Sequence, residues 1–348
     1  MTSFNYRLLG LRLLLDSQLS RNPPHELRET TLPIDEGLPT DIYLPPEARR
    51  RKNGKHQKAM IFIHGMAPRG HRDERIISLS RILAGLGLIV VVPRLQEVAD
   101  LYIQVESTRR IAEIIKIVAG DKTLCPAGRV GMLAPSFSGT LALTTAGRDD
   151  VTHLLSSLCT IGPAAEMLSS LDFFMGRPDA DPYAYMIIFK NFLHFSVRNR
   201  QKVIEAMGLA AEDDGMHRAD HERLLPDFLK TLSKKDRELF DELLTNRETR
   251  LKHWEAIRPK LAKHLEGSMP LQLLPNVQAA LTLVHGIDDN VIAPDQSELL
   301  YTECQKLGKR AKLILTPLIS HGDHSVRLSM IKDAYELAGG FGHFIENL

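Results

Sequence analysis

The sequence predicts an α/β protein with a mostly parallel central sheet flanked by helices. Short, continuous apolar runs indicate strands that are buried on both faces, and most of these runs are followed by a stretch with helical periodicity. Strands and helices that alternate in this way are typical of parallel sheets with right-handed crossovers. Two short strands, 26–33 and 40–44, are predicted ahead of them around a turn at Gly37. The six apolar runs are 59–63, 88–92, 129–133, 154–161, 280–284 and 312–315.

Three helices of this sheet domain can be placed from the sequence. Apolar periodicity predicts helices over 74–84 and 107–118. A last helix, from about Ser329 to Ala338, is expected to stop at Gly339-Gly340, because glycine commonly ends helices.

A long insertion interrupts the sheet. The stretch between Pro163 and Ala280 is far longer than the dozen or so residues that a crossover needs. Its pattern is helical, with helices predicted over 223–232, 235–244 and 247–265. We therefore expect a helical cap or lid.

The predicted domain organisation follows from these boundaries. Residues 1–25 form an N-terminal helical segment, residues 26–163 and 276–348 form the sheet domain, and residues 164–275 form the cap.

The composition is that of an ordinary globular protein. The 348 residues include 44 Lys and Arg against 43 Asp and Glu, and the net charge of +1 gives no basic excess to favour a nucleic-acid partner. The three cysteines, Cys125, Cys159 and Cys304, are sparse and widely spaced, which predicts free thiols in a reducing compartment. We therefore expect a cytoplasmic protein.

The N-terminal segment is rich in leucine from Leu8 to Leu15. Arg12 interrupts this run, Asp16 closes it, and no small-residue cleavage site follows soon after. The run is also shorter than the ~18 apolar residues of a membrane-spanning helix. The segment is expected either to pack on the body of the protein or to make peripheral contact with a membrane surface.

A serine lies at the turn between the strand 129–133 and a helical stretch. The turn reads Ala134-Pro135-Ser136-Phe137-Ser138, with small residues two positions on either side of Ser136. This arrangement is typical of a nucleophile elbow, where strand and helix approach so closely that larger side chains would clash. Ala134 and Ser138 replace the two glycines of the G-x-S-x-G pattern.

Three more chemistry-bearing motifs follow the ends of other predicted strands. They are His64-Gly65-Met66, the acids Asp288 and Asp289, and Ser320-His321-Gly322. The carboxyl ends of parallel strands lie at one edge of a sheet, so these motifs are expected to lie near Ser136.

With these four motifs the chain resembles the α/β-hydrolase superfamily from about residue 26 onward, with a lid-like insertion. The resemblance implies Ser136 as nucleophile, His321 as general base and Asp289 as the acid that orients it. It also implies an oxyanion hole made by the backbone N–H groups of Met66 and Phe137.

Two of these assignments have rivals. Asp288 is the rival acid, and Asp289 is preferred because Val291 then occupies its place in the H-G-x-x-D-x-V-V-P pattern. His324 is the rival base, and His321 is preferred because Ser320-His321-Gly322 is similar to the superfamily's G-H-G.

The resemblance implies a serine hydrolase that cleaves carboxylic esters or thioesters through an acyl-enzyme on Ser136. Such chemistry uses no cofactor and no metal, and the partner would be a small ester or thioester with an apolar part. A peptidase or acyltransferase of the same fold remains an alternative, as does a catalytically silent binding protein, because the fold does not decide the function.

Other histidines and aromatic residues allow several interpretations. His217 and His221 have the spacing of a zinc helix, but Arg218 replaces the glutamate of H-E-x-x-H, so no metal is predicted. His64 and His285 are interpreted as structural. A group of aromatic residues in the cap could line a substrate pocket or build the cap's own core. These are Phe173, Phe174, Tyr183, Tyr185, Phe189, Phe192 and Phe195.

Overall fold

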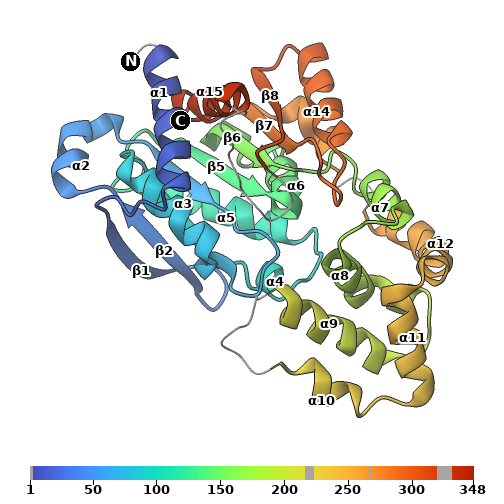
Figure 1. Cartoon of the computed structure of the whole chain (residues 1–348). Helices are drawn as coiled ribbons and strands as arrows, with labels where there is room; N and C mark the ends of the chain where they lie inside the picture. Colours follow the sequence, from blue (N-terminus) through green and yellow to red (C-terminus); the bar gives the residue numbers. More distant parts are fainter. Residues whose placement is uncertain (1–2, 216–222, 266–268, 320–330) are drawn as a thin grey trace.

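The computed structural model describes residues 3–215, 223–265, 269–319 and 331–348 (Figure 1). Its strands are β1 (Glu26–Leu32), β2 (Leu38–Leu44), β3 (Ala59–Phe62), β4 (Ile89–Pro93), β5 (Val130–Pro135), β6 (Leu155–Ile161), β7 (Ala280–Gly286) and β8 (Ala311–Thr316).

The α-helices before β6 and after β7 are α1 (Ser3–Gln18), α2 (Glu47–Asn53), α3 (Glu74–Gly85), α4 (Gln96–Ala99), α5 (Ser107–Gly120), α6 (Ser136–Ala146), α14 (Asp295–Lys306) and α15 (Ile331–Glu346). Between β6 and β7 lie α7 (Met167–Gly176), α8 (Pro182–Phe192), α9 (Gln201–Gly215), α10 (Leu225–Leu229), α11 (Lys234–Thr245), α12 (Arg247–His264) and α13 (Pro270–Leu273).

The described strands form one sheet in the order β1-β2-β4-β3-β5-β6-β7-β8. The pairs β1–β2 and β2–β4 are antiparallel, and all other neighbours are parallel. This is the mostly parallel, helix-flanked sheet that the apolar runs predict, and the predicted fold class is confirmed.

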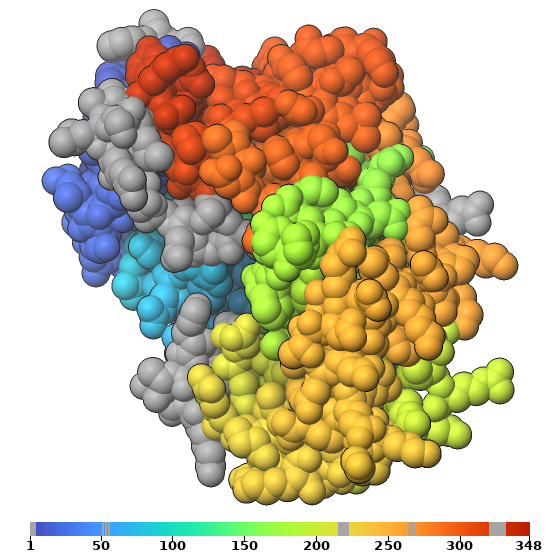
Figure 2. Space-filling view, turned by 45° about the vertical axis from the view of Figure 1, so that its right-hand side comes forward, coloured from blue at the N-terminus to red at the C-terminus, as the bar shows by residue number. Residues whose placement is uncertain are grey.

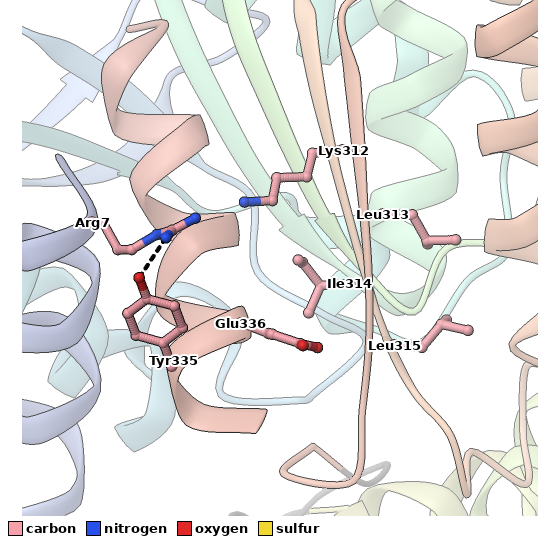
Figure 3. Close-up of a pocket in the computed structure, with 7 residues that line it drawn as sticks. All are labelled: Arg7, Lys312, Leu313, Ile314, Leu315, Tyr335 and Glu336. Atoms are coloured by element: carbon pink, nitrogen blue, oxygen red, sulfur yellow. Dashed lines mark hydrogen bonds between the residues drawn. The ribbon is translucent and has the colours of Figure 1, made fainter. Parts of the chain in front are cut away.

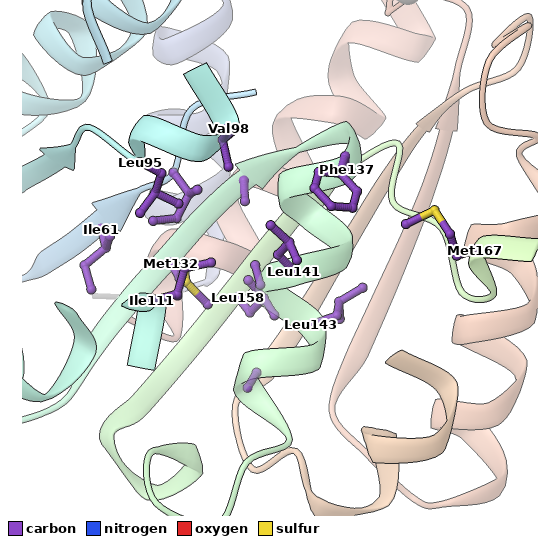
Figure 4. Close-up of a cluster of buried hydrophobic side chains, with 14 of the residues drawn as sticks. Ile61, Leu95, Val98, Ile111, Met132, Phe137, Leu141, Leu143, Leu158 and Met167 are labelled. Carbon is purple, nitrogen blue, oxygen red and sulfur yellow. The ribbon is translucent and has the colours of Figure 1, made fainter. Parts of the chain in front are cut away.

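The two faces of the sheet carry separate apolar clusters. Met60 and Phe62 of β3 pack with residues of α3 and α15 on one face. Ile61, between them, points to the opposite face and packs with α5 and α6. Figure 4 shows this second cluster, which includes Met132 of β5 and Leu141 of α6. Both faces are buried, which explains why the strands read as continuous apolar runs.

The last helix does not stop where the sequence predicts. Helix α15 continues through Gly339 and Gly340 to Glu346, so that prediction is wrong. The glycines are needed for close packing: a β-carbon on Gly340 would lie 2.8 Å from the Ile314 side chain of β8, and one on Gly342 would lie 2.9 Å from the Tyr6 carbonyl oxygen of α1. Tertiary packing, not helix termination, explains why glycine occupies these positions.

The N-terminal helix α1 packs against α15 (Figure 1). A β-carbon on Gly10 would come within 2.0 Å of the Ala338 carbonyl oxygen, and Leu13 is buried. Leu8, Leu15 and Leu19 are about half exposed. Among the described helices, none combines the length and hydropathy that crossing a bilayer requires. Contact of α1 with a lipid surface stays a prediction.

The elements that the structure describes between β6 and β7 are all helices, joined by loops. In Figure 2 the stretch from α7 to α12, coloured green to orange, forms a closely packed block. Its apolar residues are continuous with the sheet cluster that contains Met132: Phe174, Phe189 and Trp254 belong to the same group. Helices α7, α8 and α9 have no counterpart among the predicted elements. The boundaries of a cap domain stay a prediction.

Candidate active site

Ser136 stands at a strained turn between β5 and α6. Its φ of +52° lies in the left-handed region, which costs a residue other than glycine of the order of 1 kcal/mol. Helix α6 begins at Ser136, so the N–H of Phe137 lies in its first turn, where the helix dipole favours negative charge. The serine side chain is only partly buried. These features are those of a nucleophile elbow.

Close packing explains the small residues around the elbow. A β-carbon on Gly139 would lie 3.0 Å from the Ala134 carbonyl oxygen and 3.3 Å from Cβ of Thr160. Ser138, which replaces a glycine of the usual pattern, is fully buried, and its Oγ donates a hydrogen bond of 2.6 Å to the His64 carbonyl oxygen. The serine at 138 therefore connects the elbow to the loop after β3.

The loop after β3 lies directly against the elbow. A β-carbon on Gly65 would be 3.6 Å from Cγ of Pro135, in addition to the bond from Ser138. Met66, the predicted oxyanion donor, packs partly buried at the edge of the main apolar cluster. Two of the predicted strand-end motifs are therefore in contact.

His64 holds the peptide group that carries the Met66 N–H. The N–H of Leu95 donates to Nε2 at 3.1 Å, so Nδ1 carries the ring proton and donates to the Gly65 carbonyl oxygen at 2.8 Å. Because a trans peptide is planar, fixing the Gly65 carbonyl also fixes the direction of the Met66 N–H. Burial lowers the pKa of His64 to about 4. The ring is therefore neutral near pH 7.

Acid is expected to destabilise the protein through His64. The ordinary pKa of 6.5 falls to about 4 on folding, so the unfolded chain takes up a proton between these pH values that the folded chain does not. This stabilisation is fully present above pH 6.5 and is lost as pH falls toward 4, by up to about 3 kcal/mol. Urea unfolding at about pH 7.5 and about pH 4.5 measures it.

Two variants isolate this effect. His64→Asn should be less stable than the wild type at neutral pH but should lose less stability on acidification. The matched control, His25→Asn, replaces a partly exposed histidine and should keep the wild-type pH dependence. Equal pH dependence in wild type and His64→Asn would contradict the assignment.

Asp289 is the buried acid of the loop after β7. Its Oδ1 accepts hydrogen bonds from the N–H groups of Val291 and Ile292, both at 2.9 Å. Asp288, by contrast, is exposed. A β-carbon on Gly162, at the end of β6, would lie 3.3 Å from Oδ2 of Asp289, so this loop adjoins the strand next to β5.

His285, near the end of β7, is hydrogen-bonded to the same loop. It is fully buried, its Nε2 donates to the Ile292 carbonyl oxygen at 2.8 Å, and its Nδ1 lies 2.7 Å from Oγ of Ser297. Nε2 is also 3.6 Å from Oδ2 of Asp289. These contacts fit the structural role that the sequence predicts for His285.

The histidines proposed as base, His321 and its rival His324, lie outside the described residues, and so do His217 and His221. The positions of Ser136, Asp289, Met66 and Phe137 are described, while their catalytic roles stay predictions. Within the described ranges, no group of three or more His, Cys, Asp or Glu side chains could hold a metal ion.

Tyr183, which the sequence assigns with other aromatic residues to a pocket lining or to the core, contacts the loop after β3 instead. Tyr183 of α8 donates from its hydroxyl group to the Met66 carbonyl oxygen at 2.9 Å. Phe174, Tyr185, Phe189 and Phe192 are buried in the apolar cluster instead. The sequence places all of these in one aromatic group, and only Asp181-Pro182, a helix-start signal, marks the position of Tyr183 on α8.

A recess of about 290 Å³ lies away from these residues, against β8, α1 and α15 (Figure 3). Arg7 donates there to the Tyr335 hydroxyl at 2.6 Å, and burial, then the charge of Arg7, lowers the pKa of Lys312. Its lining residues are Arg7, Lys312, Leu313, Ile314, Leu315, Tyr335 and Glu336. None of the candidate catalytic residues is among them, so we place the candidate site at the strand ends.

The sequence matches no protein-family model and no curated protein. Among solved structures, Porphyromonas gingivalis dipeptidyl peptidase 4 aligns with a TM-score of 0.50 and 12% identity over 94% of this chain and 36% of that one. Pyrococcus horikoshii acylaminoacyl peptidase aligns with a TM-score of 0.49 and 17% identity over 94% of this chain and 41% of that one. A Klebsiella pneumoniae protein assigned as a dienelactone hydrolase aligns with a TM-score of 0.48 and 12% identity, over 90% of this chain and 95% of that one.

These likenesses concern the fold. This chain spans only 41% and 36% of the two peptidases, and the identities are low. The alignment at a TM-score of 0.50, together with the strand order, shows the mostly parallel, helix-flanked fold that the α/β-hydrolase resemblance implies. The resemblance seen in the sequence is confirmed at that level.

Proposed function

We propose that this protein is a serine hydrolase that cleaves carboxylic esters or thioesters through an acyl-enzyme on Ser136. The observation that carries the proposal is the left-handed φ of +52° at Ser136, at the start of α6. A serine in such a strained, accessible position is what a nucleophile elbow requires, and strain of this kind is retained where function depends on it.

The mechanism follows from the roles of the groups. A serine hydroxyl is a weak nucleophile at neutral pH, so an imidazole, proposed to be His321, takes its proton during attack. The buried carboxylate of Asp289 would orient that imidazole and stabilise the imidazolium that forms. The N–H groups of Met66 and Phe137 would donate to the tetrahedral oxyanion, and water would then release the acyl group.

The substrate class, an ester or thioester, follows from the resemblance seen in the sequence. Most aromatic residues of α7 and α8 are buried in the core, so a substrate with an apolar part is proposed from the same resemblance. A peptidase or acyltransferase would use the same catalytic groups, so the substrate panel must separate these activities.

Labelling with a fluorophosphonate probe tests the proposal. We expect the folded wild-type protein to react covalently at Ser136, with the modified peptide identified by mass spectrometry. A parallel panel of p-nitrophenyl esters, a thioester and a peptide anilide, each with and without an alcohol acceptor, should show faster turnover of the esters or thioester by water. An unlabelled, folded protein would indicate a silent binding protein, and preferred anilide cleavage would indicate a peptidase.

A further inference from the structure

We infer that Tyr183 is a positioning residue through which the cap orients the oxyanion loop. This inference rests on the proposed function, because it concerns the donor group of Met66. Three observations carry it: the hydrogen bond from Tyr183, the complementary bond from His64, and the way in which α8 is attached to the sheet domain.

The two bonds hold consecutive peptide groups of one short loop. His64, from the sheet domain, donates to the Gly65 carbonyl, and Tyr183, from the cap, donates to the next carbonyl, that of Met66. The candidate N–H of Met66 lies between these two carbonyls along the backbone. The peptide plane that carries this N–H and the plane that follows it are therefore both held, and rotation of the N–H away from the oxyanion would break at least one bond.

The start of α8 fixes where the Tyr183 ring stands. Asp181 caps the helix and accepts a hydrogen bond of 3.0 Å from the Tyr183 N–H, and Pro182 fixes the backbone at the first helical position. Burial raises the pKa of the Tyr183 hydroxyl well above its usual range, so the group remains a donor. Tyr183 is therefore held at both its backbone and its hydroxyl.

The other end of α8 is fixed to a second loop of the sheet domain. Asn191 donates to the Leu101 carbonyl oxygen at 2.9 Å and accepts from the Ile103 N–H at 2.9 Å, and Lys190 donates to the Asp100 carbonyl oxygen. Leu101 is fully buried and has a φ of +60°. These contacts fix the position of α8, so that Tyr183 at its other end can hold Met66 in place.

An apolar contact joins these two attachment points. Leu101, Ile187 and Ala211 form a small buried cluster, and Met66 and Tyr183 pack against it. The same face of α8 therefore contacts the loop after β3 and the loop between α4 and α5. Removing only the Tyr183 hydroxyl leaves this packing in place, so its effect on catalysis can be measured separately from its effect on folding.

The experiment compares Tyr183→Phe with a matched control on the same helix. Tyr185 also donates from its hydroxyl to a backbone carbonyl, that of Arg177, at 3.1 Å, but this carbonyl is outside the oxyanion loop. We expect Tyr183→Phe to lower kcat for the best p-nitrophenyl ester about 5- to 20-fold with KM nearly unchanged, because an oxyanion donor acts mainly in the transition state. Tyr185→Phe should keep the wild-type kcat.

The possible outcomes distinguish a failure of the Tyr183 inference from a failure of the proposed hydrolase function. Equal kcat in Tyr183→Phe and wild type, or equal losses in Tyr183→Phe and Tyr185→Phe, overturns the positioning role while Ser136 labelling still supports the hydrolase. If wild type is not labelled at Ser136, the proposed function fails and the inference fails with it. Thermal unfolding of each variant shows whether it folds. If Tyr183→Phe does not fold, Asp181→Ala replaces it, because this variant removes the cap at the start of α8 but keeps the tyrosine hydroxyl. Asp181→Ala should lower kcat rather than raise KM. An unchanged kcat in this variant overturns the inference.

Discussion

Ser136→Ala is expected to abolish turnover of every ester that the wild type cleaves. Without the hydroxyl no acyl-enzyme forms, and loss of the nucleophile in serine hydrolases lowers kcat by about 10⁴–10⁶-fold. Fluorophosphonate labelling should disappear together with the activity. The measurement is kcat and KM for the best p-nitrophenyl ester, with labelling of the same preparations.

The fold of this variant should be intact. Alanine has the same β-carbon as serine, so the strain of the left-handed backbone at position 136 is unchanged and the unfolding midpoint should hardly move. Ser136→Gly relieves the strain and should be inactive yet more stable than Ser136→Ala by about 1 kcal/mol.

Ser138→Ala is the matched control for the nucleophile. It removes a buried hydroxyl two positions away, together with the bond to the His64 carbonyl. This variant should lose about 1 kcal/mol of stability, retain labelling at Ser136 and keep measurable turnover. A Ser136→Ala protein that retains wild-type activity would exclude an acyl-enzyme at this position.

Asp289→Asn is expected to lower kcat by about 10²–10⁴-fold. Asparagine keeps the shape, and its carbonyl oxygen can still accept from the N–H groups of Val291 and Ile292. It lacks the negative charge that, in the proposed mechanism, would stabilise the imidazolium and select the ring tautomer. The measurement is kcat for the same ester, with urea unfolding to show that the loop is retained.

Asp288→Asn supplies the control for this prediction. Asp288 is the neighbouring acid and has the same chemistry, but it is exposed while Asp289 is buried. Asp288→Asn should keep the wild-type kcat. If Asp288→Asn is the inactive variant instead, the acid has been assigned to the wrong residue, and if both variants are active the site has no acid in this loop.

The sequence by itself determined the sheet and the location of the elbow. Strands buried on both faces must be apolar throughout, so β3 to β7 stand out locally in the chain. The tight turn at Ser136 requires small neighbours, and this steric rule is also local, so Ala134 and Ser138 mark it although both glycines have been replaced.

Only the tertiary structure decided features that depend on distant contacts. Gly339 and Gly340 read as a helix end, yet α15 passes through them because β8 and α1 pack closely against it. Asp289 is buried and Asp288 is not, because the loop after β7 folds against the end of β6. The local sequence pattern does not show which of the two acids is buried. Tyr183 reaches Met66 because α8, far along the chain, packs against the loop after β3. Periodicity records burial along one element, whereas a contact between two elements depends on how the whole chain packs.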